Sequence, residues 1–140
     1  MSILLVKNPA GANEVLRTLR LEAEDEPIDL WVALNDRIAD GRDVSWIWDV
    51  DYETVLPHAA RVVCSGTRAA DIALRAKYAG VDATRIEIVP GRADALDRAL
   101  ERAGAGGTAY VLPTYTAMLE LQRVAAERGL VRPYWEAAAT

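Results

Sequence analysis

The segment IDLWVALNDRIADGRDVSWIWDVDYE, residues 28–53, joins a strand-forming run to a long acidic stretch. Ile28–Leu34 is almost wholly apolar, which is typical of a strand buried on both faces of a parallel sheet. The acidic loop, Leu34–Glu53, carries two of the chain's four tryptophans and many carboxylates: Asp36, Asp40, Asp43, Asp49, Asp51 and Glu53. Connections between regular elements usually run about 4–6 residues, and longer ordered ones are more often functional. We therefore expect the acidic loop to carry the function, with the rest of the chain as its scaffold.

Outside this segment, short apolar runs alternate with amphipathic ones. We expect strands at Ile3–Lys7, Ile28–Leu34, Arg61–Cys64, Arg85–Val89 and Thr108–Leu112. We expect helices at Asn13–Glu22, Arg68–Tyr78, Asp94–Ala103 and Ala117–Arg128, Gly80 as a helix C-cap, and a short helix at Tyr52–Leu56 capped by Asp51. This alternation predicts an α/β fold with a mostly parallel sheet of about five strands and helices on both faces. Residues 1–129 would form the domain, and residues 130–140 a C-terminal tail.

The composition is typical of one globular domain and excludes several classes of function. The 140 residues carry a formal net charge of −5, which argues against nucleic-acid binding, because that function needs a basic face. One cysteine and one histidine are too few for a zinc site, and a lone cysteine fits a reducing compartment. The apolar run behind Ser2 is too short for a signal sequence or a membrane span, so we expect a cytoplasmic protein. The immediate start in a strand suggests a domain cut from a longer protein.

Ligands of parallel α/β sheets bind at the carboxyl ends of the strands. The sequence contains neither a P-loop nor a GxGxxG motif, so it has no recognised nucleotide-binding motif of its own. The turn formed by Ser65, Gly66, Thr67 and Arg68 joins a strand to a helix. It would hold an anion at the helix N-terminus with the help of Arg68. A plain tight turn is the alternative interpretation.

Pairs of residues in and near the acidic loop leave further alternatives open. Asp49 and Asp51 offer hard oxygen ligands for Mg²⁺, although helix caps and salt bridges also explain such acids. Trp46 and Trp48 share a face if their segment is extended, and would either be buried on the domain or contact a partner protein. We interpret Cys64 as a structural thiol, and His58 as a surface or packing residue, in preference to a nucleophile and its base.

Four blocks of the sequence resemble a known family. They are NPAG at residues 8–11 with Asn13, LNDRIADGRDVSWIWDVDYE at 34–53, SGTRAADIALRAKYAG at 65–80 and LPTYTAML at 112–119. In this order they are similar to the C-terminal domain of the MurT family, the Mur-ligase-like subunits of lipid II isoglutaminyl synthase. The resemblance runs from Val6 to Leu119 and implies a Rossmann-like domain of the Mur ligase C-terminal type.

The resemblance also implies an activity and a partner. Enzymes of this family amidate the α-carboxylate of D-glutamate in the stem peptide of lipid II, giving D-isoglutamine, with ATP and glutamine-derived ammonia. The ammonia comes from a class I glutaminase-like partner, GatD, whose Cys-His site would take an acid from the GRDxSW block, here Asp43. Asn35 and Asp36 would face the ATP site, and Trp46, Trp48 and Asp49 would contact the partner.

Cofactors and membrane contact follow from the same resemblance. The chain lacks the P-loop domain that would hold most of the ATP and Mg²⁺ in the full ligase, so the isolated domain is expected to bind neither and to be inactive. Association with the membrane would be peripheral and only through lipid II.

Two other functions remain open from the residues themselves. One is a protein-interaction module that uses Trp46 and Trp48 as anchors and does no chemistry. The other is an Mg²⁺-binding domain of receiver-like shape that uses the clustered acids.

Overall fold

The computed structural model describes residues 2–23, 26–103 and 108–129. Within them, parallel strands form a five-stranded sheet in the order β1-β5-β2-β3-β4. The strands are β1 (Ser2–Ile3), β2 (Ile28–Ala33), β3 (Ala59–Ser65), β4 (Ile86–Ile88) and β5 (Ala109–Pro113). This parallel sheet confirms the predicted α/β class.

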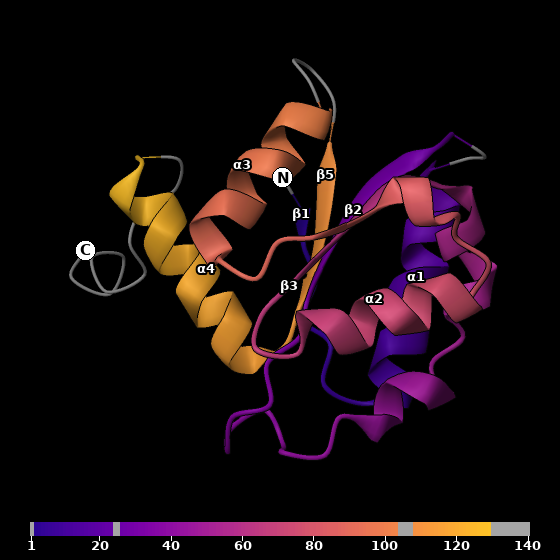
Figure 1. The fold of residues 1–140 in the computed structure, drawn as a ribbon, viewed down its shortest axis with the longest axis horizontal. Coiled ribbons are helices and arrows are strands. Elements are labelled where there is room, and N and C mark those ends of the chain that lie inside the picture. The colour runs from indigo at the N-terminus through magenta and orange to yellow at the C-terminus, as the bar shows by residue number, and fades with distance from the viewer. Residues whose placement is uncertain (1, 24–25, 104–107, 130–140) are drawn as a thin grey trace.

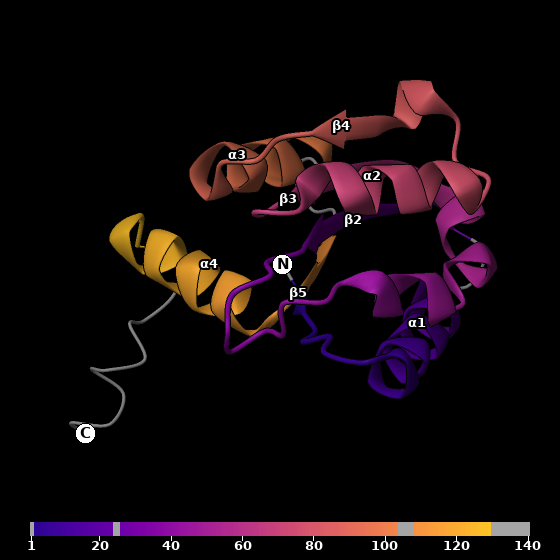
Figure 2. The same ribbon diagram turned by 60° about the horizontal axis from the view of Figure 1, so that its bottom comes forward.

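Helices cover both faces of the sheet. The two on one side are α1 (Pro9–Ala23) and α2 (Ala69–Tyr78), and the two on the other side are α3 (Arg92–Ala103) and α4 (Tyr115–Glu127). Figure 1 and Figure 2 both show the sheet between these two pairs. A helix that crosses one face of the sheet lets the next strand run parallel to the previous one. All the paired strands are parallel.

The central strand β2 contributes to both apolar cores, because successive side chains point to opposite faces. Leu30 and Val32 belong to the core against α1 and α2, whereas Trp31 and Ala33 belong to the core beneath α3 and α4. These four side chains are 1–5% exposed. The prediction that this run is buried on both faces is confirmed.

The first strand differs from its prediction. Ile3–Lys7 was expected to be a strand buried on both faces, but β1 is a two-residue strand at the edge of the sheet, and Leu5 is 38% exposed. Backbone pairing with β5 continues irregularly, as the N–H of Leu4 donates to Val111 at 2.8 Å and that of Val6 to Pro113 at 3.0 Å. An apolar run alone does not distinguish an edge strand, with one neighbour, from a central one.

Helix α1 begins earlier than predicted. It begins at Pro9 rather than at Asn13, and the Asn8 side chain accepts a hydrogen bond from the N–H of Gly11 at 2.8 Å. Asn8 thus acts as an N-cap and Pro9 takes the first helical position, where proline needs no backbone donor. The Asn-Pro pair both ends the first strand and begins the helix.

The second half of the acidic loop and the residues that follow it form short 3₁₀ turns. They are η1 (Ser45–Asp49), η2 (Tyr52–Thr54) and η3 (Leu56–His58), in place of the one helix predicted at Tyr52–Leu56. Asp51 holds the cap position of η2, but its side chain makes no capping bond. The turns bury Ile47, Tyr52 and Leu56 in the core beside α1 and α2.

Two glycines with the same backbone conformation allow a matched test. Gly66 has φ +94°, and a Cβ there would lie 2.4 Å from the carbonyl oxygen of Leu34. Gly41 has φ +93°, but a Cβ there would meet nothing within 4 Å. Gly66→Ala should lower the free energy of unfolding by about 3 kcal/mol or more, against about 1 kcal/mol for Gly41→Ala, because only the former adds a backbone clash to the strain. Urea unfolding measures both, and equal losses would contradict the close approach of the two backbones.

Candidate functional site

Three strand ends meet at the carboxyl edge of the sheet, and Asn35 joins them. Its backbone N–H donates to Thr114 Oγ1 at 3.0 Å, and its side-chain Nδ2 donates to Thr116 Oγ1 at 2.9 Å. Its Oδ1 accepts from the N–H of Thr67 at 2.9 Å. Asn35 follows β2, Thr67 follows β3, and the two threonines follow β5. Because Asn35 is only 1% exposed, it orders this edge from within.

The burial of Asn35 differs from its expected role. The residue was expected to face the ATP site, but its side chain points into the domain and its amide is engaged by the chain itself. Its neighbour Asp36 does reach the surface, with a side chain that is 33% exposed. Of the two residues, only Asp36 has a side chain that a ligand can approach.

The carboxylate of Asp40 occupies the N-terminus of α4. One oxygen accepts from the N–H of Thr116 at 2.8 Å, and the other accepts from Thr116 Oγ1 at 2.5 Å and from the N–H of Arg37 at 3.1 Å. This point lies between the neighbouring strands β2 and β5. The chain leaves these two strands toward opposite faces of the sheet. Folds of this kind bind their ligands at such a point. Asp40 therefore provides the negative charge that a bound phosphate provides at other helix N-termini.

The predicted anion-binding turn is internally satisfied. The backbone N–H groups of Gly66, Thr67 and Arg68 donate to oxygens of the chain itself at 3.3, 2.9 and 2.9 Å. The indole N–H of Trp31 donates a hydrogen bond to the hydroxyl oxygen of Ser65 at 2.5 Å. These bonds favour the plain tight turn that the sequence left open as the alternative, and anion binding at this turn stays a prediction.

Arg68 is also engaged, by two carboxylates. It donates to Asp71 through Nε and Nη2 at 2.7 and 3.2 Å, and to Asp36 through Nη1 at 3.3 Å. These acids raise the pKa of Arg68, with Asp71 the larger cause. Asp36 in turn accepts from the Thr67 hydroxyl at 2.9 Å, and this bond, followed by Arg68, lowers the pKa of Asp36.

Asp43 presents an exposed, oriented carboxylate. Its Oδ1 accepts from the N–H of Ser45 at 2.9 Å, and the described part of the chain supplies hydrogen bonds to Asp43 from Ser45 alone. The backbone of Ser45, then its side chain, and to a lesser extent the charge of Arg68, lower the pKa of Asp43. The carboxylate is therefore ionised at neutral pH, and its exposure leaves it accessible to a partner.

A shallow hollow of about 230 Å³ adjoins Asp43. Its lining residues come from the acidic loop and from the start of α2: Arg42, Asp43, Val44, Ser45, Ile47, Trp48, Arg68 and Asp71. The hollow thus combines an acid, a guanidinium and an indole. A side chain inserted there by another protein would meet Asp43 and Trp48 together.

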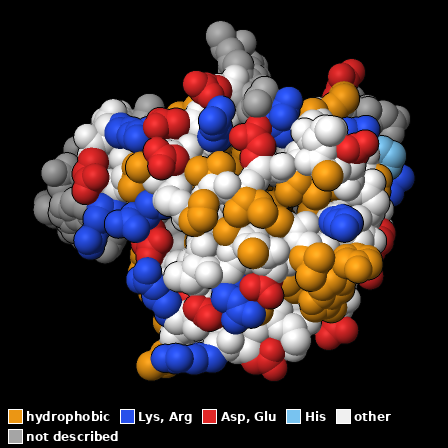
Figure 3. Space-filling model, in the orientation of Figure 1, with side chains coloured by type: hydrophobic (Ala, Val, Ile, Leu, Met, Phe, Trp, Pro, Cys, Tyr) orange, Lys and Arg blue, Asp and Glu red, His pale blue; other side chains and the backbone are white. Residues whose placement is uncertain are grey.

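The two tryptophans of the acidic loop separate. Because η1 is helical rather than extended, Trp46 and Trp48 do not share a face: Trp46 packs against the core, and Trp48 is 46% exposed. Trp48 meets Tyr78 edge-on, with ring centroids 5.8 Å apart. Asp49 is exposed beside them. Figure 3 shows hydrophobic side chains gathered on the face of the molecule that α2 covers.

Arg75 is a residue that sequence reasoning missed. It is 4% exposed, although the sequence places a charge there among the inward positions Ile72 and Ala76 of α2. That spacing was the available signal, because residues three positions apart, such as Ile72 and Arg75, lie on the same side of a helix. Its partners are residues of the acidic loop. The Nε of Arg75, for example, donates to the carbonyl oxygen of Ile47 at 2.9 Å.

Cys64 and His58 do not form a catalytic pair. They lie toward opposite ends of β3, and burial raises the pKa of Cys64 to about 12, so its thiol stays protonated at neutral pH. The structural interpretation of Cys64 is confirmed by its burial.

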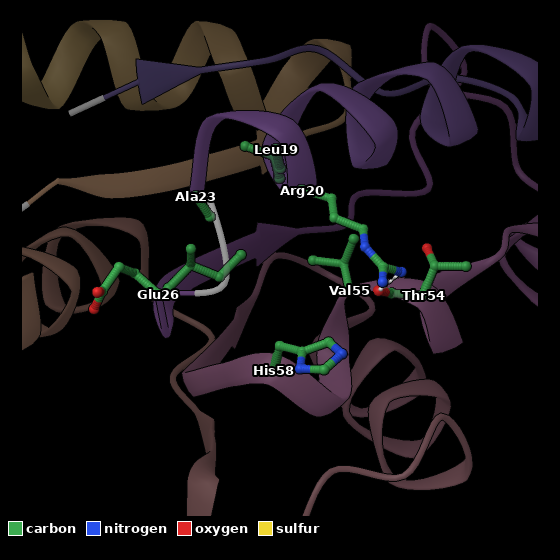
Figure 4. A pocket seen from close by; sticks show the side chains of 8 residues that line it. Leu19, Arg20, Ala23, Glu26, Thr54, Val55 and His58 are labelled. Carbon is green, nitrogen blue, oxygen red and sulfur yellow. Dashed lines mark hydrogen bonds between the residues drawn. The ribbon is translucent and has the colours of Figure 1, made fainter.

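His58 instead lines a small cavity at the other end of the sheet, shown in Figure 4. With a volume of about 30 Å³, the cavity has room for about one water molecule. Arg20 reaches across it to the carbonyl oxygen of Thr54 at 3.3 Å.

Metal and membrane sites receive no support from the described residues. Among residues 2–23, 26–103 and 108–129, no group of three or more His, Cys, Asp or Glu side chains is placed to hold a metal ion. In the same ranges, no helix has both the length and the hydropathy needed to span a membrane.

The parallel sheet with helices on both faces defines an α/β domain, and this architecture is consistent with a Mur ligase C-terminal domain. The family model for the MurT ligase C-terminal domain matches residues 5–118. The chain therefore belongs to the MurT ligase C-terminal family, as the resemblance predicted.

Two relatives illustrate the match. The chain is 36% identical over 132 residues to the MurT subunit of lipid II isoglutaminyl synthase (glutamine-hydrolyzing) from Streptococcus pneumoniae, covering 94% of this chain. It is 35% identical over 120 residues to the subunit of the same name from Staphylococcus aureus, covering 83% of this chain. The matched region spans 29% and 25% of those relatives' lengths.

Replacing Asn35 tests its role at the carboxyl edge. Asn35→Ala removes both side-chain bonds and leaves polar groups unpaired in a closed site, so the free energy of unfolding should fall by about 2–4 kcal/mol. Asn13→Ala is the control, because it removes a bond of similar length, 2.8 Å to the N–H of Asp51, at an exposed position. Its loss should be about 1 kcal/mol or less. Denaturant unfolding would contradict this role if both variants lost the same amount.

The pKa of Asp43 should depend on Ser45. Ser45→Ala keeps the backbone donor but removes the hydroxyl, so the pKa should rise partway toward the ordinary 3.8. A lowered pKa of Asp43 stabilises the fold at pH values above the unfolded-state pKa. This contribution is lost as the pH falls through the folded-state pKa. The variant should therefore lose less free energy of unfolding on acidification than the parent protein does. Carbon-detected NMR titration of the carboxyl groups measures the shift. Asp36, held by other partners, is the internal control, and an unmoved Asp43 would refute the dependence.

Proposed function

We propose that this chain is the C-terminal domain of the ligase subunit of lipid II isoglutaminyl synthase, the name that its relatives carry. The full complex would amidate the D-glutamate α-carboxylate in the stem peptide of lipid II to D-isoglutamine, using ATP and ammonia from glutamine. The domain docks the glutaminase subunit, GatD, and supplies Asp43 to its Cys-His site. The complex is cytoplasmic and touches the membrane only through lipid II.

The observation that supports this role best is the state of Asp43. An acid that completes a Cys-His site fixes the histidine tautomer and stabilises its cation while the thiolate attacks the amide. It must therefore be ionised, oriented and accessible. Asp43 meets all three conditions, since the N–H of Ser45 orients it, its pKa is lowered, and its side chain is exposed.

Trp48 and Asp49 are proposed partner contacts. Trp48 lines the same hollow as Asp43 and is 46% exposed, and large aromatic side chains are common at the centres of interfaces. Trp46 packs against the core, so its contribution is to support the turn. A partner residue that reaches Asp43 would also cover the indole of Trp48.

The carboxyl edge does not fit a resident nucleotide. The carboxylate of Asp40 takes the N-terminus of α4, and the N–H groups of the turn after β3 are already bonded. We therefore assign ATP and Mg²⁺ to other parts of the full ligase. Asp36 is the predicted ATP-facing residue that reaches the surface, and the isolated domain is expected to lack activity.

A docking module without chemistry is the second candidate, and the exposure of Trp48 favours it. The two candidates differ in what they predict for Asp43. A module needs the carboxylate, if at all, for binding, whereas a completed Cys-His site needs it for turnover.

Asp43→Asn in the full complex separates the two candidates. The amide keeps the shape of the carboxylate but cannot stabilise the histidine cation, so glutaminase kcat should fall roughly 10²–10⁴-fold with assembly retained. Asp97→Asn is the control, since Asp97 is an exposed acid of α3, on the face of the sheet opposite α2. Glutamate release and the affinity of the two subunits are measured together. A variant at the wild-type rate refutes the proposed role, and weak assembly with normal turnover favours the docking module.

A further inference from the structure

One buried guanidinium holds the 3₁₀ turns of the acidic loop against α2. Arg75 donates through Nε to the carbonyl of Ile47 at 2.9 Å and through Nη2 to the carbonyl of Val50 at 2.7 Å. It also pairs with the carboxylate of Glu53, whose side chain is 52% exposed. With the arginine 4% exposed, its charge is satisfied almost wholly by this loop.

The same guanidinium supports two aromatic rings. Its central carbon lies 5.3 Å from the ring centroid of Trp48 and 5.4 Å from that of Tyr52. Both distances are within the range of cation–π attraction, which is strongest for tryptophan. Trp48 is thus held between Arg75 and the edge of Tyr78, which explains how a half-exposed indole keeps a fixed position.

The turn that Arg75 holds also orients Asp43. Ser45, the first residue of η1, donates the N–H that fixes the carboxylate. Within η1, the N–H of Ile47 bonds to the carbonyl of Val44 at 3.2 Å, and the carbonyl of Ile47 accepts from Arg75. Asp43 is therefore separated from the guanidinium by one short turn, whose geometry those bonds set.

We propose that Arg75 is a positioning residue for Asp43 and Trp48. The inference rests on the proposed function, in which Asp43 completes the partner's Cys-His site. Arg75 touches neither the partner nor glutamine. Its hydrogen bonds fix the position of η1 relative to α2. They thereby set the direction in which the carboxylate of Asp43 and the indole of Trp48 point.

Arginine is needed here for its fork and not only for its charge. Nε and Nη2 reach two carbonyls three residues apart while the planar face lies against two rings, a combination that an ammonium group cannot reproduce. Arg75→Lys keeps the charge but loses at least one carbonyl bond and the flat face. It is therefore the informative substitution.

The test is a double-mutant cycle on glutaminase activity in the complex of the full-length subunits. Arg75→Lys should lower kcat roughly tenfold to a hundredfold, the scale of a misplaced catalytic group, and leave the KM for glutamine unchanged, because glutamine binds in the partner. In an Asp43→Asn background the same substitution should have no further effect, since there is no carboxylate left to position. Arg128→Lys is the control, because Arg128 pairs with Asp97 on the opposite face of the sheet and should leave kcat unchanged.

Each outcome decides the matter. A loss of kcat in the parent that disappears in the Asp43→Asn background supports the positioning role. No loss, or an equal loss in both backgrounds, overturns it and leaves the proposed function standing. If Asp43→Asn alone turns over at the wild-type rate, the proposed function fails first and the inference with it.

A fold-neutral variant guards against misfolding of Arg75→Lys. Glu53→Gln keeps the arginine but weakens the pair that holds it from the solvent side. It should give a smaller loss of kcat that also disappears in the Asp43→Asn background. Thermal unfolding confirms that each variant is folded, and a Glu53→Gln loss that persists without Asp43 overturns the inference.

Discussion

A single buried amide, that of Asn35, sets the order of the carboxyl edge of the sheet. An amide has both donors and an acceptor, so it can satisfy a backbone N–H of one loop and a hydroxyl of another at the same time. The bonds to Thr67 and Thr116 use this property to join segments more than 30 and 80 residues away. The acidic loop is therefore ordered from its first residue, and its acids fall in fixed places.

The acids of the loop differ in how many hydrogen-bond partners each one has. Asp40 has both oxygens bound at the start of α4, and Asp36 has both oxygens bound by Thr67 and Arg68. Asp43 has one oxygen held by Ser45. A loop that appears uniformly acidic in the sequence thus contains internal anions, an ion pair and one acid oriented for use.

Sequence patterns predicted the parts of this structure that depend on local rules. The apolar run at Ile28–Leu34 predicted the central strand, and Gly80 lies after α2 with φ +101°, as a C-cap glycine should. The bonding of the turn at residues 65–68 could not be predicted from local rules, because its backbone donors are satisfied by Asn35, Leu34 and Pro90, which are remote in the sequence. The same holds for Arg75, whose charge is satisfied by residues of the acidic loop that lie 22 to 28 positions earlier in the chain. Asp43 was singled out by family resemblance, since spacing alone does not distinguish it from its acidic neighbours.

The burial of Cys64 makes it a reporter of the opening of the sheet. The thiol lies in β3, between β2 and β4, and is 0% exposed. Alkylating reagents attack the thiolate, which forms only when the side chain reaches water. Brief exposure of the chain to such a reagent would therefore label molecules whose central strands have separated and spare those in which only a surface loop has moved.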